Sequence, residues 1–261
     1  MLILLPPSEG KTPPAPGTAV DLDRLSFPSL APARRKVRDA LVETSGRDDA
    51  LTLLKVSTGL APEVARNLAL AGADAAPAAQ VYTGVLYAAA DLAGAAAGAP
   101  GTPARDRLPS VLTISALWGA VTPLDVIPAY RLSMSVDLPG IGPLGAFWRE
   151  LLDDVLAPQA SGDVVVDCRS SSYVSAWRPG SSADWVMVKV LRELDGKRSV
   201  VSHNAKHTRG VLTGHLLRRA GEPPRTRHEL LDAAQELVGS ALREATLHEA
   251  ARGAHTLELV V

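Results

Sequence analysis

A short polar segment near the start of the chain holds the first side chains that could bind a ligand. Residues 8–12 read Ser-Glu-Gly-Lys-Thr and follow an apolar run. Gly-Lys-Thr ends the phosphate-binding loop of many nucleoside triphosphatases, in which the lysine contacts phosphate and a helix starts at once. That loop also needs a glycine where this chain has Leu5, and the prolines after Thr12 oppose a helix because proline lacks an amide donor. We therefore expect a strand that delivers Ser8 and Lys11 into a loop.

The densest group of candidate binding residues lies between His203 and His228. It contains six lysine or arginine side chains, one acidic side chain and four of the six histidines of the chain. One interpretation is a metal site, because His203 and His207 have the four-residue spacing of ligands on a zinc-binding helix. The glutamate of that motif is absent, and the cation of Lys206 would repel a metal ion. We therefore predict no metal site and no cofactor.

The same segment could instead bind an anion. If Asn204 caps a helix, Lys206 and Arg209 lie three residues apart on one face of its first turns. The free N–H groups and positive dipole end of such a helix bind phosphate or carboxylate. The alternative is that these charges only solvate an exposed helix, and the sequence leaves both interpretations open.

Further polar side chains that could contact a ligand occur on separate segments. Tyr82 and Thr83 precede a glycine, which permits close approach of the backbone, and Tyr130 is followed by Arg131. Asp125 stands in an apolar neighbourhood. We expect its carboxylate to be hydrogen-bonded or paired, with Arg131 as the obvious type of partner, because an unpaired buried charge is costly.

Two other motifs resemble functional elements but have simpler explanations. Residues 138–143 match the hairpin of a DNA-binding helix-hairpin-helix, yet the preceding sequence favours a strand, so we expect a β-turn. Cys168 ends a predicted strand, which is a position that some catalytic nucleophiles occupy. A phosphatase loop also needs an arginine after its cysteine, and this chain has Val174 at that position. We expect a thiol at the edge of the core.

The composition is that of a soluble globular protein. Hydrophobic residues make up 46% of the chain and the net charge is −1, so any binding to nucleic acid needs a local basic patch. One cysteine excludes an internal disulfide. No apolar run approaches the roughly 18 residues of a membrane span, and no positively charged leader is visible. We expect a monomeric cytoplasmic protein without membrane contacts.

Strands and helices alternate along the chain. Apolar runs predict buried strands at 2–5, 111–115 and 164–168. Helical spacing predicts helices at 30–44, 145–156 and 204–221, and two helices joined by a tight turn within 51–72. Residues 184–194 fit either a strand or a helix, and a hairpin is expected around Gly253. We predict an α/β (mixed α+β) fold as a single compact domain, 1–261, with a mixed sheet and flanking helices.

Several segments, in order along the chain, resemble the YaaA family of peroxide stress proteins, also called UPF0246 or DUF328. The matching segments are MLILLPPSEGKT, LKVSTGLA, VYTGV, ISALWGAVTPLDVIPAYRLSM, FWRE, VVVDCRSSSY and NAKHTRG. They run from residue 1 to residue 210. In this comparison Lys11 matches the lysine in the family's N-terminal segment, and Ser170 matches a serine that the family has in the segment VVVDCRSSSY.

The resemblance implies a compact α/β fold with a deep, positively charged cleft and a helix-hairpin-helix element tied to DNA binding. It also implies a cytosolic role in limiting damage by iron and peroxide through lower free intracellular iron. We assign the hairpin element to 51–72, with backbone groups of Ser57, Thr58 and Gly59 facing a phosphate. Gly59 stands where the family commonly has a lysine, so we expect a divergent member.

Three functions remain open. The first is a non-enzymatic stress protein whose cleft binds DNA or another phosphate-bearing ligand. The second is an enzyme that acts on a small nucleotide-like or phosphorylated substrate in the same cleft, with Lys11 or Tyr130 moving protons. The third is iron binding by the histidines, which the nearby cations oppose. The candidate cleft residues are Ser8, Lys11, Tyr82, Thr83, Tyr130, Arg131, Ser170, Asn204, Lys206 and Arg209. The catalytic candidates, for an enzyme, are Lys11, Tyr130, Arg131, Lys206 and Arg209.

Overall fold

The centre of the fold is a mixed sheet of eight strands. The computed structural model describes residues 1–200 and 202–261, including their side chains except those of 200 and 202–204. β1 (Leu2–Leu5) lies between β3 (Val111–Ser115) and β8 (Val164–Asp167) and runs parallel to both. Every residue of these three strands is buried. Parallel strands buried on both faces read as continuous apolar runs, which explains why the sequence predicts them well.

The sheet extends on both sides of this parallel centre. β9 (Asp184–Leu194) pairs parallel with β8, and β12 (His255–Val260) pairs parallel with β9. The antiparallel strands are β4 (Gly119–Val121) on β3, β10 (Lys197–Val200) on β9, and β11 (Glu244–His248) on β12. The undecided segment 184–194 is therefore a strand, since it pairs along both edges and buries alternate valines. The expected terminal hairpin is formed by β11 and β12.

Two small antiparallel pairs lie outside the main sheet. β2 (Ala76–Pro77) pairs with β5 (Val126–Ile127), and β6 (Asp137–Leu138) pairs with β7 (Gly142–Pro143). The second pair contains the turn expected at 138–143. Gly140 and Gly142 have φ values of 78° and 89°, a region that favours glycine.

Two helices pack closely beside the sheet. α10 (Ser202–Arg218) crosses α5 (Val85–Ala90) at Gly210, where a Cβ atom would lie 2.3 Å from the carbonyl oxygen of Leu86.

The predicted helices at 30–44 and 145–156 are α1 (Ala31–Ser45) and α8 (Leu144–Ala160). The other helices are α4 (Ala78–Val81), α6 (Leu92–Ala97), α7 (Pro103–Asp106), α9 (Ser171–Val174), α11 (Arg227–Gln235), η1 (Pro28–Leu30) and η4 (Leu108–Ser110).

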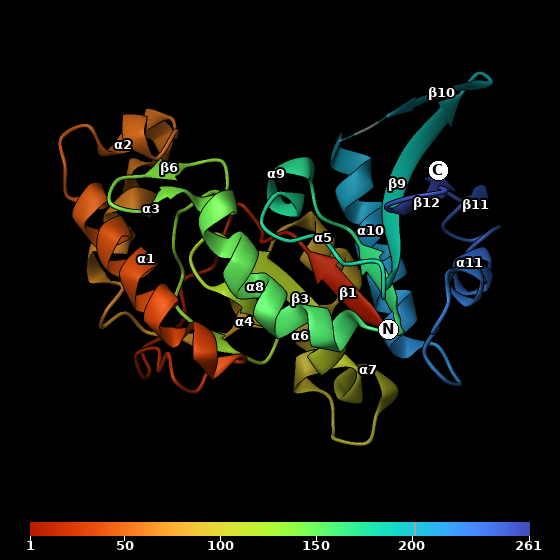
Figure 1. Cartoon of the computed structure of the whole chain (residues 1–261), viewed down its shortest axis with the longest axis horizontal. Coiled ribbons are helices and arrows are strands. Elements are labelled where there is room, and N and C mark those ends of the chain that lie inside the picture. Colours follow the sequence, from red (N-terminus) through yellow and green to blue (C-terminus); the bar gives the residue numbers. More distant parts are fainter. Residues whose placement is uncertain (201) are drawn as a thin grey trace.

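The segment 51–72 contains short helices instead of two long ones. They are α2 (Ala50–Leu53), η2 (Thr58–Leu60), α3 (Ala61–Arg66) and η3 (Asn67–Ala69). Figure 1 shows α1, α2, α3 and β6 at one end of the molecule, β9 to β12 with α11 at the other, and β1 between them.

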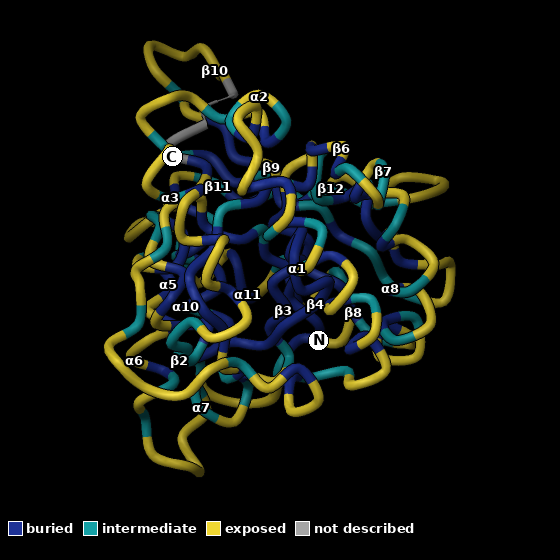
Figure 2. The backbone as a smooth tube through the Cα atoms, turned by 90° about the vertical axis from the view of Figure 1, so that its left-hand side faces the viewer, coloured by how far each residue is buried: buried dark blue, intermediate teal, exposed yellow. Residues whose placement is uncertain are grey.

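The burial pattern follows this arrangement. Figure 2 shows the strands β3, β4 and β8 buried at the centre, with exposed loops around them. Within residues 1–200 and 202–261, none of the helices combines the length and the apolarity needed to cross a membrane.

Candidate functional site

A cavity of about 330 Å³ lies where the loops after β1 and β8 meet α10. Loops that follow neighbouring parallel strands leave the sheet at the same edge, where α/β proteins commonly bind ligands. In Figure 1, α9 and α10 flank the end of β1. Five cationic side chains and one carboxylate line the described part of the cavity: Lys11, Lys55, Arg131, Lys206, Arg209 and Glu9. Six of the ten predicted cleft residues belong to this lining: Ser8, Lys11, Arg131, Ser170, Lys206 and Arg209.

Lys11 is held by the loop that follows β1. Its ammonium group donates to the carbonyl oxygen of Ser8 at 2.9 Å and lies 4.3 Å from the ring centroid of Tyr130. The backbone of Lys11 forms a bridge to Tyr82, and Thr12 donates its N–H to Val81 at 3.0 Å. No helix follows Thr12 until Pro28, in agreement with the rejection of a nucleoside triphosphatase loop.

Burial and a neighbouring cation change the proton affinity of Lys11. Loss of solvent lowers its pKa most, Arg131 lowers it further, and the carboxylates of Glu63 and Glu9 oppose both effects. The resulting pKa is about 7, compared with the ordinary 10.5. An amine with this pKa exists partly as the free base at neutral pH, which suits proton transfer or nucleophilic attack.

Tyr82 and Tyr130 lie behind Lys11 and are not among the residues that line the cavity. Their hydroxyl groups are 2.9 Å apart, and that of Tyr130 is 2.7 Å from the hydroxyl of Ser115. Burial raises the pKa of both phenols well above the ordinary 10.0. They are therefore neutral at physiological pH and support the ammonium of Lys11 through the ring of Tyr130. Thr83 is exposed, and its hydroxyl lies 3.0 Å from that of Thr12.

Arg131 is positioned by a side chain that the sequence did not single out. The amide group of Asn67, fully buried, accepts from the backbone N–H of Arg131 at 2.8 Å and donates to its carbonyl oxygen at 2.9 Å. The guanidinium of Arg131 reaches Glu63 at 3.4 Å and the carbonyl of Glu9 at 3.2 Å. The element 51–72 thus fixes one wall of the cavity through Asn67 and Glu63.

The suggested pairing of Asp125 with Arg131 is wrong. Asp125 accepts hydrogen bonds from the backbone N–H and hydroxyl of Ser26 and from the N–H of Thr122. These three donors satisfy the buried carboxylate, as the sequence predicts, and the arginine that interacts with its charge is the buried Arg34. Arg131 is instead paired with Glu63.

The loop after β8 is anchored by an ion pair. Asp167 and Arg169 form a bidentate contact at 2.7 and 2.8 Å, and both side chains are fully buried. This pair holds Ser170 at the cavity. Cys168 is buried in the same wall, and burial raises the pKa of its thiol to about 12, so it is a core thiol at neutral pH and not a nucleophile.

Two cations reach the cavity from α10. Arg209 donates to the carbonyl oxygen of Val188 at 2.8 and 3.1 Å, which ties its guanidinium to β9. Lys206 is half exposed and lies 3.4 Å from the carboxylate of Glu9. The proposed cap of Asn204 and the side chain of His203 lie outside the described side chains.

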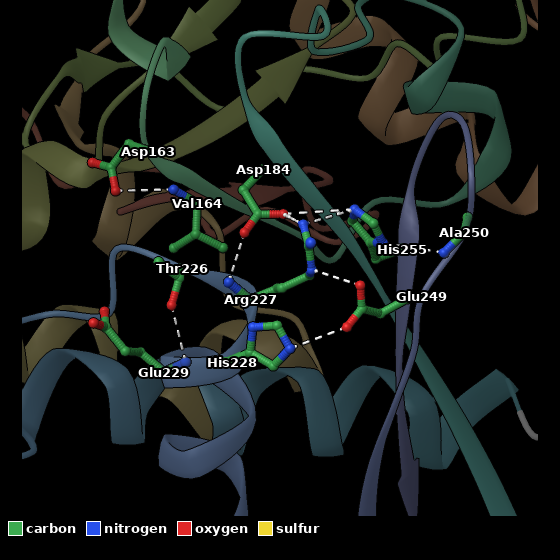
Figure 3. Close-up of polar contacts among 10 residues, drawn as sticks. All are labelled: Asp163, Val164, Asp184, Thr226, Arg227, His228, Glu229, Glu249, Ala250 and His255. Atoms are coloured by element: carbon green, nitrogen blue, oxygen red, sulfur yellow. Dashed lines mark hydrogen bonds and ion pairs between the residues drawn. The ribbon is translucent and has the colours of Figure 1, made fainter.

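Several other basic residues between 215 and 228 form ion pairs of their own. Figure 3 shows Arg227 between Asp184 and Glu249, with His228 in contact with the other oxygen of Glu249. His215 pairs with Glu236 at 2.8 Å. These side chains do not line the cavity. Among residues with described side chains, no three or more histidine, cysteine, aspartate or glutamate side chains form a potential metal site.

The predicted hairpin residues lie beside the cavity and not in it. Ser57, Thr58 and Gly59 are exposed and are not part of its lining, although Lys55 and Val56 are. Their contact with DNA remains a prediction. Lys55, Asn67 and Glu63 were missed because a lone polar residue in a helical segment has no signal of its own in one sequence.

Comparison with known proteins identifies relatives along most of the chain. The family model described as peroxide stress protein YaaA matches residues 1–236. A UPF0246 protein of Streptomyces coelicolor is 45% identical over 242 residues, covering 91% of this chain and 90% of that protein. A UPF0246 protein of Corynebacterium efficiens is 39% identical over 241 residues, covering 90% and 92%. One from Corynebacterium glutamicum strain R is 35% identical over 266 aligned residues, covering both chains in full. The chain therefore belongs to the YaaA family of peroxide stress proteins.

Proposed function

We propose that the cavity binds a phosphate-bearing ligand of about nucleotide size and that this binding underlies a role in the peroxide stress response. The observation that supports the proposal is the convergence, among the described side chains, of five cations from four separate segments on a space with one lining carboxylate, Glu9. Arginine and lysine side chains are the usual protein partners of phosphate oxygens. Ser8 and Ser170 add hydroxyl groups that can donate to the same oxygens.

The size of the cavity favours a small ligand or a single nucleotide of a strand. A volume of about 330 Å³ is near the lower end of typical ligand pockets. A DNA duplex does not fit in such a space. DNA would therefore bind through a strand end, a displaced nucleotide, or phosphate contacts at the rim, where Lys206 is half exposed.

Thermal unfolding with inorganic phosphate, pyrophosphate, nucleotides and sugar phosphates tests this proposal. A ligand at 100 times its dissociation constant stabilises the folded chain by about 2.7 kcal/mol, and the double variant Lys206→Ala, Arg209→Ala should lose that gain. Lys189→Ala is the matched control, because Lys189 is exposed, paired with Glu258 and not part of the cavity lining. No stabilisation by any of these anions contradicts the proposal.

Binding to DNA is a separate arm of the same test. An affinity for duplex or single-stranded DNA that depends on phosphate contacts falls steeply with salt concentration. Salt-dependent binding that the double variant abolishes supports DNA as the ligand source. An affinity for DNA that is flat with salt, together with a response to small anions, favours a small ligand. The family resemblance also leads us to expect that the protein limits free iron. Elemental analysis of the protein after incubation with ferrous iron tests whether it binds the metal.

An enzyme that acts on a phosphorylated substrate is the second candidate function. The pKa of about 7 at Lys11 favours an enzyme, since strongly shifted pKa values are typical of groups that transfer protons or act as nucleophiles. Tyr130 is a poor proton donor or acceptor here because burial raises its pKa well above 10.0.

A further inference from the structure

The amine of Lys11 occupies a position suited to covalent chemistry. It lines the cavity, and its nitrogen donates to the carbonyl oxygens of Ser8 at 2.9 Å and Glu9 at 3.5 Å. A free amine has two N–H groups and one lone pair, so donation of both N–H groups leaves the lone pair available. Lysines become nucleophiles when they are desolvated or placed beside another cation. Lys11 meets both conditions, because Arg131 is the cation that faces it.

The other cations of the cavity are suited to a different task. The guanidinium groups of Arg131 and Arg209 are tied to protein carbonyl or carboxylate oxygens, and their fork of N–H donors matches the oxygens of a phosphate. Lys206 is half exposed and contacts Glu9 at 3.4 Å. The positive charges of these three side chains can hold an anion. The cavity therefore combines fixed cations with one amine that can lose its proton near neutral pH.

We propose that Lys11 forms an imine with the carbonyl group of a phosphorylated aldehyde or ketone whose phosphate is held by Arg131, Lys206 and Arg209. The nitrogen lone pair of the free amine attacks the carbonyl carbon and gives a carbinolamine. Loss of one water then forms the C=N bond, with the oxygen of that water from the carbonyl and its two hydrogens from the amine. The reaction needs no oxidant or reductant. This inference names the substrate class of the proposed phosphate site and rests on that proposed function.

The charges that face Lys11 determine the pH range of the reaction. Arg131 comes from the segment before β6, Glu63 from α3 and Glu9 from the loop after β1, while Lys206 and Arg209 reach the cavity from α10. Burial lowers the pKa of Lys11 most, Arg131 lowers it further, and Glu63 and Glu9 raise it, which leaves a pKa of about 7. Imine formation should therefore reach half its maximal rate near pH 7. An exposed lysine, with an ordinary pKa of ~10.4, would require a much higher pH.

Pyridoxal 5′-phosphate provides the probe, with phosphate-free pyridoxal as its matched control. The native full-length chain is incubated with each aldehyde, reduced with borohydride and mapped by peptide mass spectrometry. We expect Lys11 to be labelled roughly tenfold or more faster than Lys55 and Lys206, because its lowered pKa of about 7 leaves much of its amine unprotonated at pH 7. Pyridoxal should label Lys11 more slowly, since it lacks the phosphate group. Lys11→Arg should remove the label, and Lys189→Arg should keep it.

The outcomes separate the two proposals. Phosphate stabilisation with no label on Lys11, or with labelling spread evenly over the lysines, overturns the imine and leaves the phosphate site intact. Equal labelling by pyridoxal and its phosphate, without stabilisation by any anion, overturns the phosphate site and with it the phosphorylated substrate class. Because labelling is read on the wild-type chain, the test does not depend on the folding of Lys11→Arg.

Discussion

At the scale of single residues, the buried pair of Asp167 and Arg169 illustrates how the chain holds its cavity wall. The carboxylate accepts from the guanidinium through both oxygens and from the indole N–H of Trp185 at 3.1 Å. Each charge satisfies the other, and neither side chain is exposed. The pair adds less to stability than its contacts suggest, since both ions were removed from water. If only one of the two side chains is replaced, however, the charge of the other remains buried without a partner.

We predict that Arg169→Leu destabilises the fold by about 3–5 kcal/mol, the usual cost of breaking a buried ion pair. Urea unfolding of the variant and the wild type measures this difference. Arg35→Ala is the control, because the pair of Arg35 with Asp23 is exposed and should contribute little. Equal effects of the two substitutions would show that the buried pair has no special role in stability.

The titration of Lys11 leads to a prediction about stability and pH. The unfolded chain protonates this lysine below pH 10.5, whereas the folded chain does so only below about pH 7. Between these values the unfolded chain holds more protons than the folded chain, so the free energy of unfolding should rise with pH. Well below pH 7 both states hold this proton, and Lys11 should not change how the free energy of unfolding depends on pH. One proton corresponds to at most ~1.4 kcal/mol per pH unit.

Lys11→Met should remove this part of the slope. Urea unfolding midpoints of both chains between pH 7 and pH 9 measure it. The range stops at pH 9 because the thiol of Cys168, whose pKa burial raises from 9.0 to about 12, makes the opposite contribution above that value. Parallel slopes for the two chains would mean that Lys11 has an ordinary pKa in the folded state.

At the scale of elements, the contact between η3 and the segment around Arg131 connects the helical end of the molecule with the cavity. Asn67 uses both of its amide hydrogens, toward Ser45 and the carbonyl of Arg131, and its oxygen accepts from the N–H of Arg131. A side-chain amide thus substitutes for a neighbouring strand along this stretch. The position of Arg131 therefore depends on a residue 64 positions away along the chain.

We predict that Asn67→Ala costs about 1–3 kcal/mol of stability, because it leaves the partly buried N–H of Arg131 without its acceptor. It should also weaken phosphate binding, since the guanidinium loses its fixed backbone. Ser45→Ala is the matched control, as it removes only the 3.1 Å hydrogen bond to Asn67 and no contact of Arg131. Urea unfolding and phosphate titration of both variants provide the two measurements. A stable Asn67→Ala chain with wild-type affinity would contradict this role.

The elements differ in how well the sequence predicts them. The strands β1 and β3 are predicted to the residue, since buried parallel strands are short apolar runs between loops. The strand β9 was undecided because its identity depends on pairing with β8 and β12, which are remote in sequence. Lys11 is likewise remote in sequence from Lys206 and Arg209, so spacing along the chain could not bring them together. The prediction that they share one site rested on their residue types and on the family resemblance. Asn67 could not be predicted, because its role depends on where a distant segment passes.

At the scale of the whole molecule, charge is distributed unevenly around a nearly neutral total. The net charge is −1, yet the described lining of the cavity has five cations and one carboxylate. Eight of the other arginines, all of them in the described part of the chain, are paired with a carboxylate, as Arg198 is with Glu193 and Glu244. A second hollow, near Arg225, Arg227 and Arg252, is the main competing place for an anion. Arg227 there is already in contact with Asp184 and Glu249, which reduces its attraction for a ligand.

This distribution predicts where a bound anion protects the backbone. Inorganic phosphate at saturating concentration should slow amide hydrogen exchange in the segments that surround the cavity, because a ligand that bridges them suppresses their local opening. The segments are 8–11, 54–56, 131–135, 168–173 and 206–209. The hairpin of β11 and β12 provides the internal control, since it forms one edge of the sheet, none of its residues line the cavity, and it should exchange at an unchanged rate. Protection confined to 225–227 and 250–253 would instead place the anion in the second hollow. The variant Lys206→Ala, Arg209→Ala should lose protection at all the cavity segments together, including 131–135, which belongs to a different part of the chain.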